Sequence, residues 1–162
     1  MSITRTHDIV DELRNRLPDG AVVTDPDLLA GYASDAAALC LSEPPMAAVL
    51  PRNEEEVALV MAASRRYRVP VVPQGALTGL SGGANTRREC LALNTRRMNR
   101  IVSIDPVNRI AVVEPGVVNK QLRDAAAEHG LTYRPDPSSW GRPPSAATSL
   151  PMRAGSAASS TA

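Results

Sequence analysis

The amino-acid sequence predicts an α+β fold, because short apolar runs of strand length occur among longer segments of helical period. Three of these runs have the length of buried strands, and they lie at 46–50, 69–72 and 91–93. Amphipathic segments at 6–17 and 119–128 predict helices. The chain of 162 residues is long enough to bury a core. That core must be mainly aliphatic, because the chain has three tyrosines, one tryptophan and no phenylalanine.

The first predicted elements lie before residue 45. Apolar residues at helical spacing predict a helix over 6–17, and the turn-forming residues 18–20 end it. A short strand is predicted over 21–23. Asp25 is followed by a proline, a pattern that predicts the start of a helical turn reaching Tyr32.

The segment after the first apolar run predicts the best-defined helix of the chain. Asn53 is a favourable N-cap, and glutamates fill positions 54–56, where the helix dipole favours negative charge. Glu56 has the position that closes a capping box, and arginines between 65 and 68 fall in the last turn. The predicted inward stripe of this helix consists of Val57, Val60 and Met61.

The remaining elements follow the same two patterns. Pro73 is expected to end the strand over 69–72, because proline has no N–H for a strand ladder. The turn residues 105–108 separate two further apolar runs and predict a hairpin with strands at 101–104 and 109–113. The residues Glu114, Pro115 and Gly116 then predict a turn, and Gly130 is expected to end the helix over 119–128.

Composition excludes several classes of protein. The net charge of +1 argues against a nucleic-acid-binding surface, and no apolar run reaches the roughly 18 residues of a membrane span. Residues 1–17 contain acidic side chains and no apolar core, so we expect no signal peptide and a cytoplasmic protein. Cys40 and Cys90 lack metal-ligand spacing, and neither His7 nor His129 has the neighbours of a catalytic triad. We therefore predict no metal site and no catalytic residue in this chain.

A glycine-rich loop over 74–83 directly follows the predicted strand at 69–72. Glycines allow successive backbone N–H groups to point into one concavity, and they let a phosphate approach the backbone closely. Thr78 and Ser81 add hydroxyl donors, so the loop suits a diphosphate without any lysine. It is neither a P-loop nor a Rossmann fingerprint. From spacing alone, a phosphate-binding loop and a glycine-rich connection without a ligand both stay open.

Two further segments are rich in turn residues. The prolines of the segment 135–139 restrict the backbone and present two serines at low entropic cost. The segment 113–117 places a proline and a glycine at the end of a predicted strand. Taken separately, each segment also fits an ordinary surface turn.

Taken together and in order, the three segments resemble the FAD-linked oxidases of the vanillyl-alcohol oxidase, or PCMH, type. Within this family the chain is most similar to the branch of the glycolate oxidase D subunit and the FAD-linked D-lactate dehydrogenases. The resemblance covers roughly residues 20–140. It implies the N-terminal half of a PCMH-type FAD-binding domain, with a small mixed sheet flanked by helices.

The resemblance also implies which residues contact FAD. The diphosphate would lie against the loop residues Gln74, Gly75, Ala76, Leu77, Thr78, Gly79, Leu80 and Ser81. Pro135, Asp136, Ser138 and Ser139 would lie against the flavin, and Pro115 would line the same cleft. The chain departs from the family at Leu77, where glycine or arginine is usual, and at Arg134, where a small residue or proline is common.

The activity implied by the resemblance is oxidation of a small 2-hydroxy acid of the glycolate or D-lactate type by an FAD-dependent enzyme. The sequence does not indicate which subunits would accept electrons. Two alternatives stay open: a non-catalytic, truncated FAD-binding fragment, and a flavoprotein similar to the UDP-acetylenolpyruvoylglucosamine reductases of the same superfamily. The segment 135–139 favours the hydroxy-acid branch. We expect the chain of 162 residues to have no turnover by itself.

The expected organisation has three parts. Residues 1–44 form a helical and extended segment, 45–140 form the first half of the FAD-binding domain, and 141–162 form a disordered tail without acidic residues. Degenerate codons for the tail, read in a shifted frame from Pro143 onward, can encode T-I-G-G-N-V-A-T-N-A-G-G-L-C-C-V-K-Y-G, which is the continuation expected for the family. We therefore expect the tail to be a frameshifted translation. Sequencing of the gene through codon 140 tests this expectation.

Overall fold

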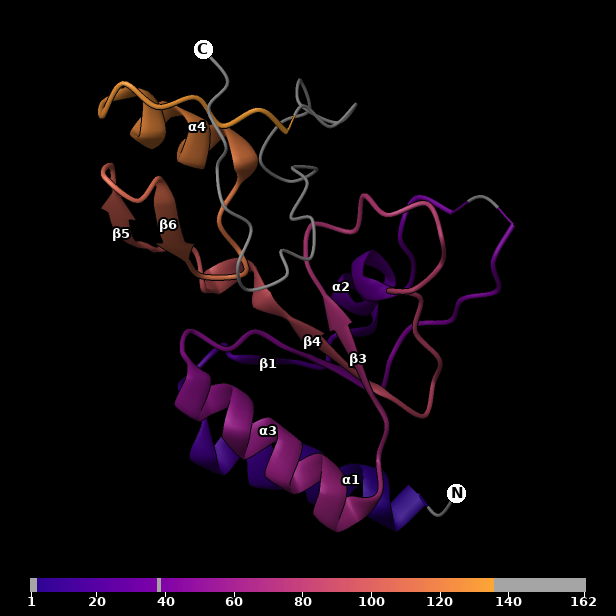
Figure 1. Ribbon diagram of the computed structural model, residues 1–162. Coiled ribbons are helices and arrows are strands. Elements are labelled where there is room, and N and C mark those ends of the chain that lie inside the picture. The colour runs from indigo at the N-terminus through magenta and orange to yellow at the C-terminus, as the bar shows by residue number, and fades with distance from the viewer. Residues whose placement is uncertain (1–2, 38, 136–162) are drawn as a thin grey trace.

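The computed structural model describes residues 3–37 and 39–135 (Figure 1). Its main helices and strands follow one another in the order that the sequence predicts. In chain order they are α1 (Ile3–Arg16), β1 (Val22–Val23), α2 (Pro26–Leu29), the 3-10 turn η1 (Ala30–Tyr32), β2 (Ala47–Val49), α3 (Glu54–Tyr67), β3 (Val71–Gln74), β4 (Leu91–Asn94), the 3-10 turn η2 (Thr95–Arg97), β5 (Ile101–Asp105), β6 (Ile110–Val113) and α4 (Asn119–Ala127). None of the helices in this part of the chain has the length and apolarity to cross a membrane.

Two sheets organise the described residues. In the first, the strand order is β1-β2-β4-β3, with β2, β4 and β3 parallel and β1 antiparallel to β2. In the second, β5 and β6 form an antiparallel hairpin. The predicted α+β fold with a small mixed sheet is therefore confirmed. Since β2, β4 and β3 run in the same direction, their carboxyl ends meet at one edge of the sheet.

The first sheet is covered on both faces. Helices α1 and α3 pack side by side against one face, and α2 lies on the other (Figure 1). On the α1 and α3 side, the buried strand residues are Ala47, Val49, Leu91 and Leu93, which pack with Ile9, Leu13, Val60 and Ala63. On the opposite side, Ala48, Leu50 and Ala92 pack with Leu29 and Tyr32. Burial on both faces explains why β2 and the first three residues of β4 are continuously apolar.

The start of α3 confirms one prediction and corrects another. The Asn53 side chain accepts a hydrogen bond from the Glu56 N–H at 2.9 Å, so Asn53 is the N-cap. The Glu56 carboxylate accepts from the Arg52 N–H at 2.8 Å, and not from Asn53 as a capping box requires. The guanidinium of Arg52 also donates to this carboxylate. This second contact explains why the Glu56 carboxylate binds the N–H of Arg52 and not that of Asn53.

The inward stripe of α3 differs from the prediction at Met61, which is 48% exposed. The buried residues of the helix are Glu56, Val60 and Ala63, spaced by four and three positions. Met61 follows Val60 directly and is therefore rotated about 100° away from the sheet. Val57 is partly buried against the core, as predicted.

Pro73 does not end its strand, because β3 continues through Pro73 to Gln74. Strand β3 lies at the edge of the sheet and pairs with β4 alone, Pro73 being opposite Leu93. An edge strand turns alternate N–H groups away from its neighbour, so a proline is tolerated there. This extension carries the end of β3 to the glycine-rich loop.

The second sheet packs against α4. The predicted hairpin is confirmed, and the Asp105 carboxylate accepts from the N–H groups of Val107 and Asn108 in its turn. The helix and the hairpin share a small apolar cluster, formed by Val117, Leu122 and Tyr133 with Ile101, Ala111 and Val113.

An ion pair joins the two ends of the hairpin and predicts a stability change in acid. The Arg100 side chain donates to the Glu114 carboxylate at 2.9 and 2.6 Å, and this contact is the main reason why the pKa of Glu114 is lowered. A lowered folded-state pKa stabilises the protein above the ordinary glutamate range, and that contribution is lost as the pH falls through the folded pKa. We expect Glu114→Gln to flatten the acid limb of stability against pH.

Urea unfolding between neutral pH and pH 3 measures this effect. The pKa values of Glu12 and Asp105 are also lowered, so part of the acid dependence should survive in the variant. Glu89→Gln, at an exposed position, is the matched control and should keep the wild-type curve. Parallel curves for wild type and Glu114→Gln would contradict the prediction.

Candidate functional site

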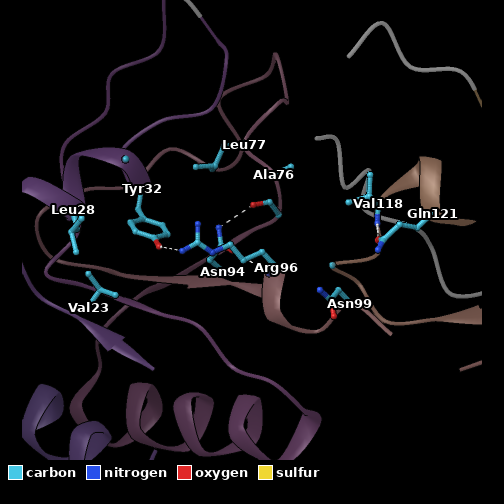
Figure 2. Close-up of a pocket in the computed structure, with 13 residues that line it drawn as sticks. Val23, Leu28, Tyr32, Ala76, Leu77, Asn94, Arg96, Asn99, Val118 and Gln121 are labelled. Carbon is cyan, nitrogen blue, oxygen red and sulfur yellow. Dashed lines mark hydrogen bonds between the residues drawn. The ribbon is translucent and has the colours of Figure 1, made fainter. Parts of the chain in front are cut away.

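A pocket of about 600 Å³ lies at the carboxyl ends of β3 and β4, between the first sheet and the start of α4 (Figure 2). The carboxyl edge of parallel strands is the usual ligand site in open α/β sheets. The volume lies within the range of small-molecule and cofactor sites. The pocket is lined by Val23, Leu28, Gly31, Tyr32, Gly75, Ala76, Leu77, Asn94, Arg96, Asn99, Gly116, Val118 and Gln121.

The glycine-rich loop reaches the pocket with its first residues. Gly75, Ala76 and Leu77 follow β3 directly and line the cavity. Leu77 has a φ of 60°, a left-handed conformation that leucine rarely adopts. This conformation explains why glycine is favourable at the position, and it makes leucine here a source of backbone strain.

Gln74, the last residue of β3, fixes the start of the loop through its side-chain amide. The side chain is 3% exposed, and its Nε2 donates to the carbonyl oxygens of Tyr32 and Ala84, both at 2.8 Å. Tyr32 belongs to η1, and Ala84 directly follows the loop. The amide therefore ties β3 to η1 and to the end of the loop. Gln74 therefore has a structural role in the present geometry.

The second half of the loop packs against the segment between η1 and β2. The Ala36 N–H donates to the Gly79 carbonyl at 2.9 Å, and Asp35 lies close to Gly79. Thr86, fully buried, places its hydroxyl 2.7 Å from the carbonyl oxygen of Glu43. These contacts hold the loop from Gly79 onward against the segment between η1 and β2, and they leave Gly75, Ala76 and Leu77 at the pocket.

A chain of hydrogen bonds joins three walls of the pocket (Figure 2). The buried Asn94 side chain donates to the Gly75 carbonyl at 3.0 Å and accepts from the Arg96 N–H at 3.1 Å. The Arg96 Nη2 donates to the Tyr32 hydroxyl at 2.8 Å, and its guanidinium lies 5.5 Å from the centre of the Tyr32 ring. The network fixes Arg96 relative to the glycine-rich loop.

The fourth wall is the predicted turn at 114–116 and the start of α4. The Gly116 N–H donates to the Met98 carbonyl at 2.7 Å, which brings the turn against η2. The Gln121 side chain accepts from the Val118 N–H at 3.2 Å and closes the first turn of α4. Gly116, Val118 and Gln121 all face the cavity.

The structure places the residues implied by the resemblance in three groups. Gly75, Ala76 and Leu77 line the pocket, with Gln74 buried beneath them. Five implied residues do not line the pocket but are next to lining residues or further along the loop: Thr78, Gly79, Leu80, Ser81 and Pro115. The carbonyl of Pro135 accepts a hydrogen bond from Arg123 at 3.3 Å. Asp136, Ser138 and Ser139 lie outside the described residues. The binding roles of all these residues stay predictions.

Sequence reasoning missed five polar residues of the pocket: Tyr32, Asn94, Arg96, Asn99 and Gln121. Arg96 belongs to a basic stretch whose simplest interpretation is a solvated surface. One signal was present, because Asn94 and Arg96 follow a predicted strand that is parallel to the strand before the glycine-rich loop. Residues after neighbouring parallel strands meet at one sheet edge.

The pocket has the chemistry of a binding site. Arg96 is the charged residue among its thirteen lining residues, and the other polar groups are amides, a phenol and backbone. Among the residues that the structure describes, no group of histidine, cysteine and acidic side chains has the arrangement of a metal site. The arrangement suits an elongated organic anion.

Comparison with known proteins identifies the family. Residues 45–161 match the family described as "FAD binding domain". The chain belongs to this FAD-binding domain family. The match begins at the predicted boundary of the domain, and it extends into 141–161, which the frameshift hypothesis assigns to another reading frame. DNA sequencing through codon 140 distinguishes the two reading frames.

Several relatives of this FAD-binding domain are 2-hydroxy-acid enzymes by name. It is 39% identical to the glycolate oxidase subunit GlcD of Escherichia coli strain K12 over 127 residues, which cover 78% of this chain and 25% of the relative. It is 42% identical to the D-lactate dehydrogenase of Archaeoglobus fulgidus over 89 residues, 55% of this chain and 20% of the relative. The chain thus spans about a quarter of the length of the relatives it matches.

Solved structures agree with the fold. A crystal structure of p-cresol methylhydroxylase with substrate bound matches with a TM-score of 0.71 and 26% identity, over 80% of this chain and 26% of that one. The predicted fold of a PCMH-type FAD-binding domain is therefore confirmed over the part that the chain covers, and FAD is the cofactor that the family binds.

The residues of the pocket fit FAD. Backbone of the glycine-rich loop lies along one wall, Arg96 offers a positive charge near it, and the apolar side chains Val23 and Leu28 line another part of the cavity. A dinucleotide needs this combination, because its diphosphate is anionic and its ring systems are largely apolar. The amide groups of Asn99 and Gln121 offer further hydrogen-bonding partners.

The strained backbone at Leu77 predicts an unusual order of stability for two variants. Leu77→Ala keeps a side chain in the left-handed conformation, whereas Leu77→Gly removes that strain. We expect the glycine variant to be more stable than the alanine variant by about 1 kcal/mol, although glycine is ordinarily the less favourable residue. Thermal and urea unfolding of the two variants measures the difference. The reverse order would show that the backbone at this position is not left-handed.

Proposed function

We propose that this chain supplies the diphosphate-binding part of an FAD-dependent oxidoreductase that acts on 2-hydroxy acids of the glycolate or D-lactate type. The observation that carries the proposal is the loop after β3, whose residues Gly75 to Leu77 line a pocket at the carboxyl ends of parallel strands. The names of the relatives support the substrate class.

The proposed roles of the residues are binding and positioning. The backbone of Gly75, Ala76 and Leu77 binds the diphosphate, and Gln74 holds the loop in place. The remaining contacts, proposed from the family resemblance, are Thr78, Gly79, Leu80, Ser81, Pro115, Pro135, Asp136, Ser138 and Ser139. When bound, FAD supplies the two-electron redox chemistry, while the protein orients it. We propose no catalytic residue in this chain.

The proposal has a consequence for activity. The chain covers about a quarter of its hydroxy-acid relatives, so we propose that it binds flavin but does not turn over by itself. The domain organisation proposed here keeps the boundaries of the sequence interpretation: 1–44, 45–140 and a tail over 141–162. A cytoplasmic location stays a prediction from composition.

Titration of the purified full chain with FAD tests the proposal. We expect saturable quenching of flavin fluorescence and a purified protein that keeps flavin absorbance after gel filtration. Glycolate, D-lactate and D-2-hydroxyglutarate are then offered with an artificial electron acceptor, and we expect no reduction. Failure to bind FAD would refute the binding role, and oxidation of any of the three acids would refute the absence of turnover.

A further inference from the structure

The electrostatics of the pocket depend on one side chain. Arg96 is the charged member of the lining set, and the loop from Gln74 to Gly83 contains neither lysine nor arginine. Lys120, the single lysine of the chain, pairs with Asp124 on α4. A diphosphate that approaches the loop therefore finds its cationic partner at Arg96.

The guanidinium of Arg96 is not neutralised by an acid. Its side-chain hydrogen bond goes to the phenol of Tyr32, and among the described residues it forms no ion pair with a carboxylate. A guanidinium has five N–H donors in a planar fork that matches phosphate oxygens. The bond to Tyr32 uses one of these donors and leaves the guanidinium able to bind an anion.

The position of the guanidinium is set by neighbouring groups. Asn94 binds both the Arg96 N–H and the Gly75 carbonyl, so the arginine backbone and the start of the loop are joined through one buried amide. Tyr32 is 7% exposed and holds the far end of the side chain (Figure 2). A fixed guanidinium loses less conformational entropy on binding than a free one.

Resting on the proposed FAD-binding function, we propose that Arg96 binds the diphosphate of the dinucleotide and makes this chain prefer FAD to uncharged riboflavin. Tyr32 is a positioning residue that aims the guanidinium through its hydroxyl. The lysine-free loop then supplies backbone donors, and Arg96 supplies the charge.

Affinities of the full chain for FAD, ADP and riboflavin test the proposal by calorimetry. A charge-assisted hydrogen bond accounts for about a tenfold change in affinity or more. We expect Arg96→Gln to lower the affinities for FAD and ADP by about that factor and to leave the affinity for riboflavin unchanged. The ADP affinity of the wild type should fall with added salt, and it should fall less steeply in the variant.

Arg97→Gln is the matched control. Arg97 is the neighbouring exposed arginine, carries the same charge and does not line the pocket. We expect Arg97→Gln to change all three affinities by less than about twofold, because Arg97 is exposed outside the pocket lining, where water and salt screen its charge. Equal losses in both variants would show a general charge effect and overturn the proposal. If Arg96→Gln lowered the affinity for riboflavin as much as the affinity for FAD, Arg96 would have a purely structural role, and this result would also overturn the proposal.

The same measurements separate this inference from the proposed function. If the wild type binds FAD and Arg96→Gln binds it equally well, the inference fails and the FAD-binding function stands. If the wild type binds ADP through Arg96 but not FAD, the FAD function fails while the diphosphate site stands. If it binds neither, both are wrong. Circular dichroism of each variant confirms that the fold is retained.

Discussion

Gly116→Ala is expected to destabilise the protein by about 3 kcal/mol, the upper part of the usual range for overpacking. A Cβ atom at this position would lie 2.3 Å from the Thr95 carbonyl oxygen and 2.7 Å from the Met98 carbonyl oxygen. Real Cβ atoms essentially never approach other atoms below 3.0 Å, and both obstacles are backbone atoms, which move only with η2 itself. The turn must therefore shift away from η2.

This shift affects the pocket as well as stability. The Gly116 N–H bond to Met98, at 2.7 Å, holds the turn in place, and Gly116 lines the cavity. We therefore expect Gly116→Ala to weaken FAD binding in addition to lowering the urea midpoint.

Gly31→Ala is the matched control for Gly116→Ala. Gly31 also lines the pocket, but an added Cβ there would meet no atom within 4 Å. We expect its unfolding free energy to lie within about 0.5 kcal/mol of the wild type. Equal stability of Gly116→Ala and Gly31→Ala would mean that the turn does not pack against η2 as closely as described.

Gln74→Glu is expected to lose about 3 kcal/mol of stability at neutral pH, because an unpaired buried charge is costly. The present amide donates to two carbonyl oxygens at 2.8 Å, those of Tyr32 and Ala84. A carboxylate of the same shape has no proton to donate, so the oxygen that replaces Nε2 would face both carbonyls without a hydrogen bond.

The pH dependence of this variant has a defined sign. Burial and the lack of donors raise the folded-state pKa of the new carboxyl above its unfolded value. The variant therefore approaches wild-type stability in acid, where the protonated group donates to one carbonyl, and it becomes less stable as the pH rises through the raised pKa. Urea unfolding at pH 4 and pH 7 measures the difference.

Gln121→Glu controls for the loss of an amide elsewhere in the pocket. Gln121 is exposed in the first turn of α4 and only accepts a hydrogen bond from Val118, which a carboxylate also accepts. A negative charge near a helix N-terminus is favourable, so we expect no loss of stability. If the stabilities of Gln74→Glu and Gln121→Glu changed with pH in parallel, this would contradict the burial of Gln74 between two carbonyls.

Local pattern predicted most elements of this fold within a few residues. The cap at Asn53, the hairpin turn at Asp105 and the helix over 119–128 depend on short-range hydrogen bonds and side-chain periodicity, which neighbouring residues determine. The errors at Pro73 and Met61 have a different origin. Whether a strand lies at a sheet edge, and which side of a helix faces the sheet, depends on partners distant in the sequence.

The candidate site divides in the same way. The glycine-rich loop and its place after a strand could be predicted, since glycine content and strand length are local properties. The left-handed conformation of Leu77 could be anticipated only as a departure from the family pattern. Arg96 follows a predicted strand, but its contact with Tyr32 could not be predicted from neighbouring residues, because Tyr32 is 64 positions away.

The sequence by itself thus determined the order of the elements, the α+β class and the loop that relates the chain to FAD-binding domains. Only the tertiary structure decided which residues share the pocket. Parallel pairing of β3 with β4 brings the loop after one strand beside Asn94 and Arg96 after the other, and packing of η1 on the sheet adds Tyr32. Such contacts form between segments that are far apart in the chain, so no local pattern contains them.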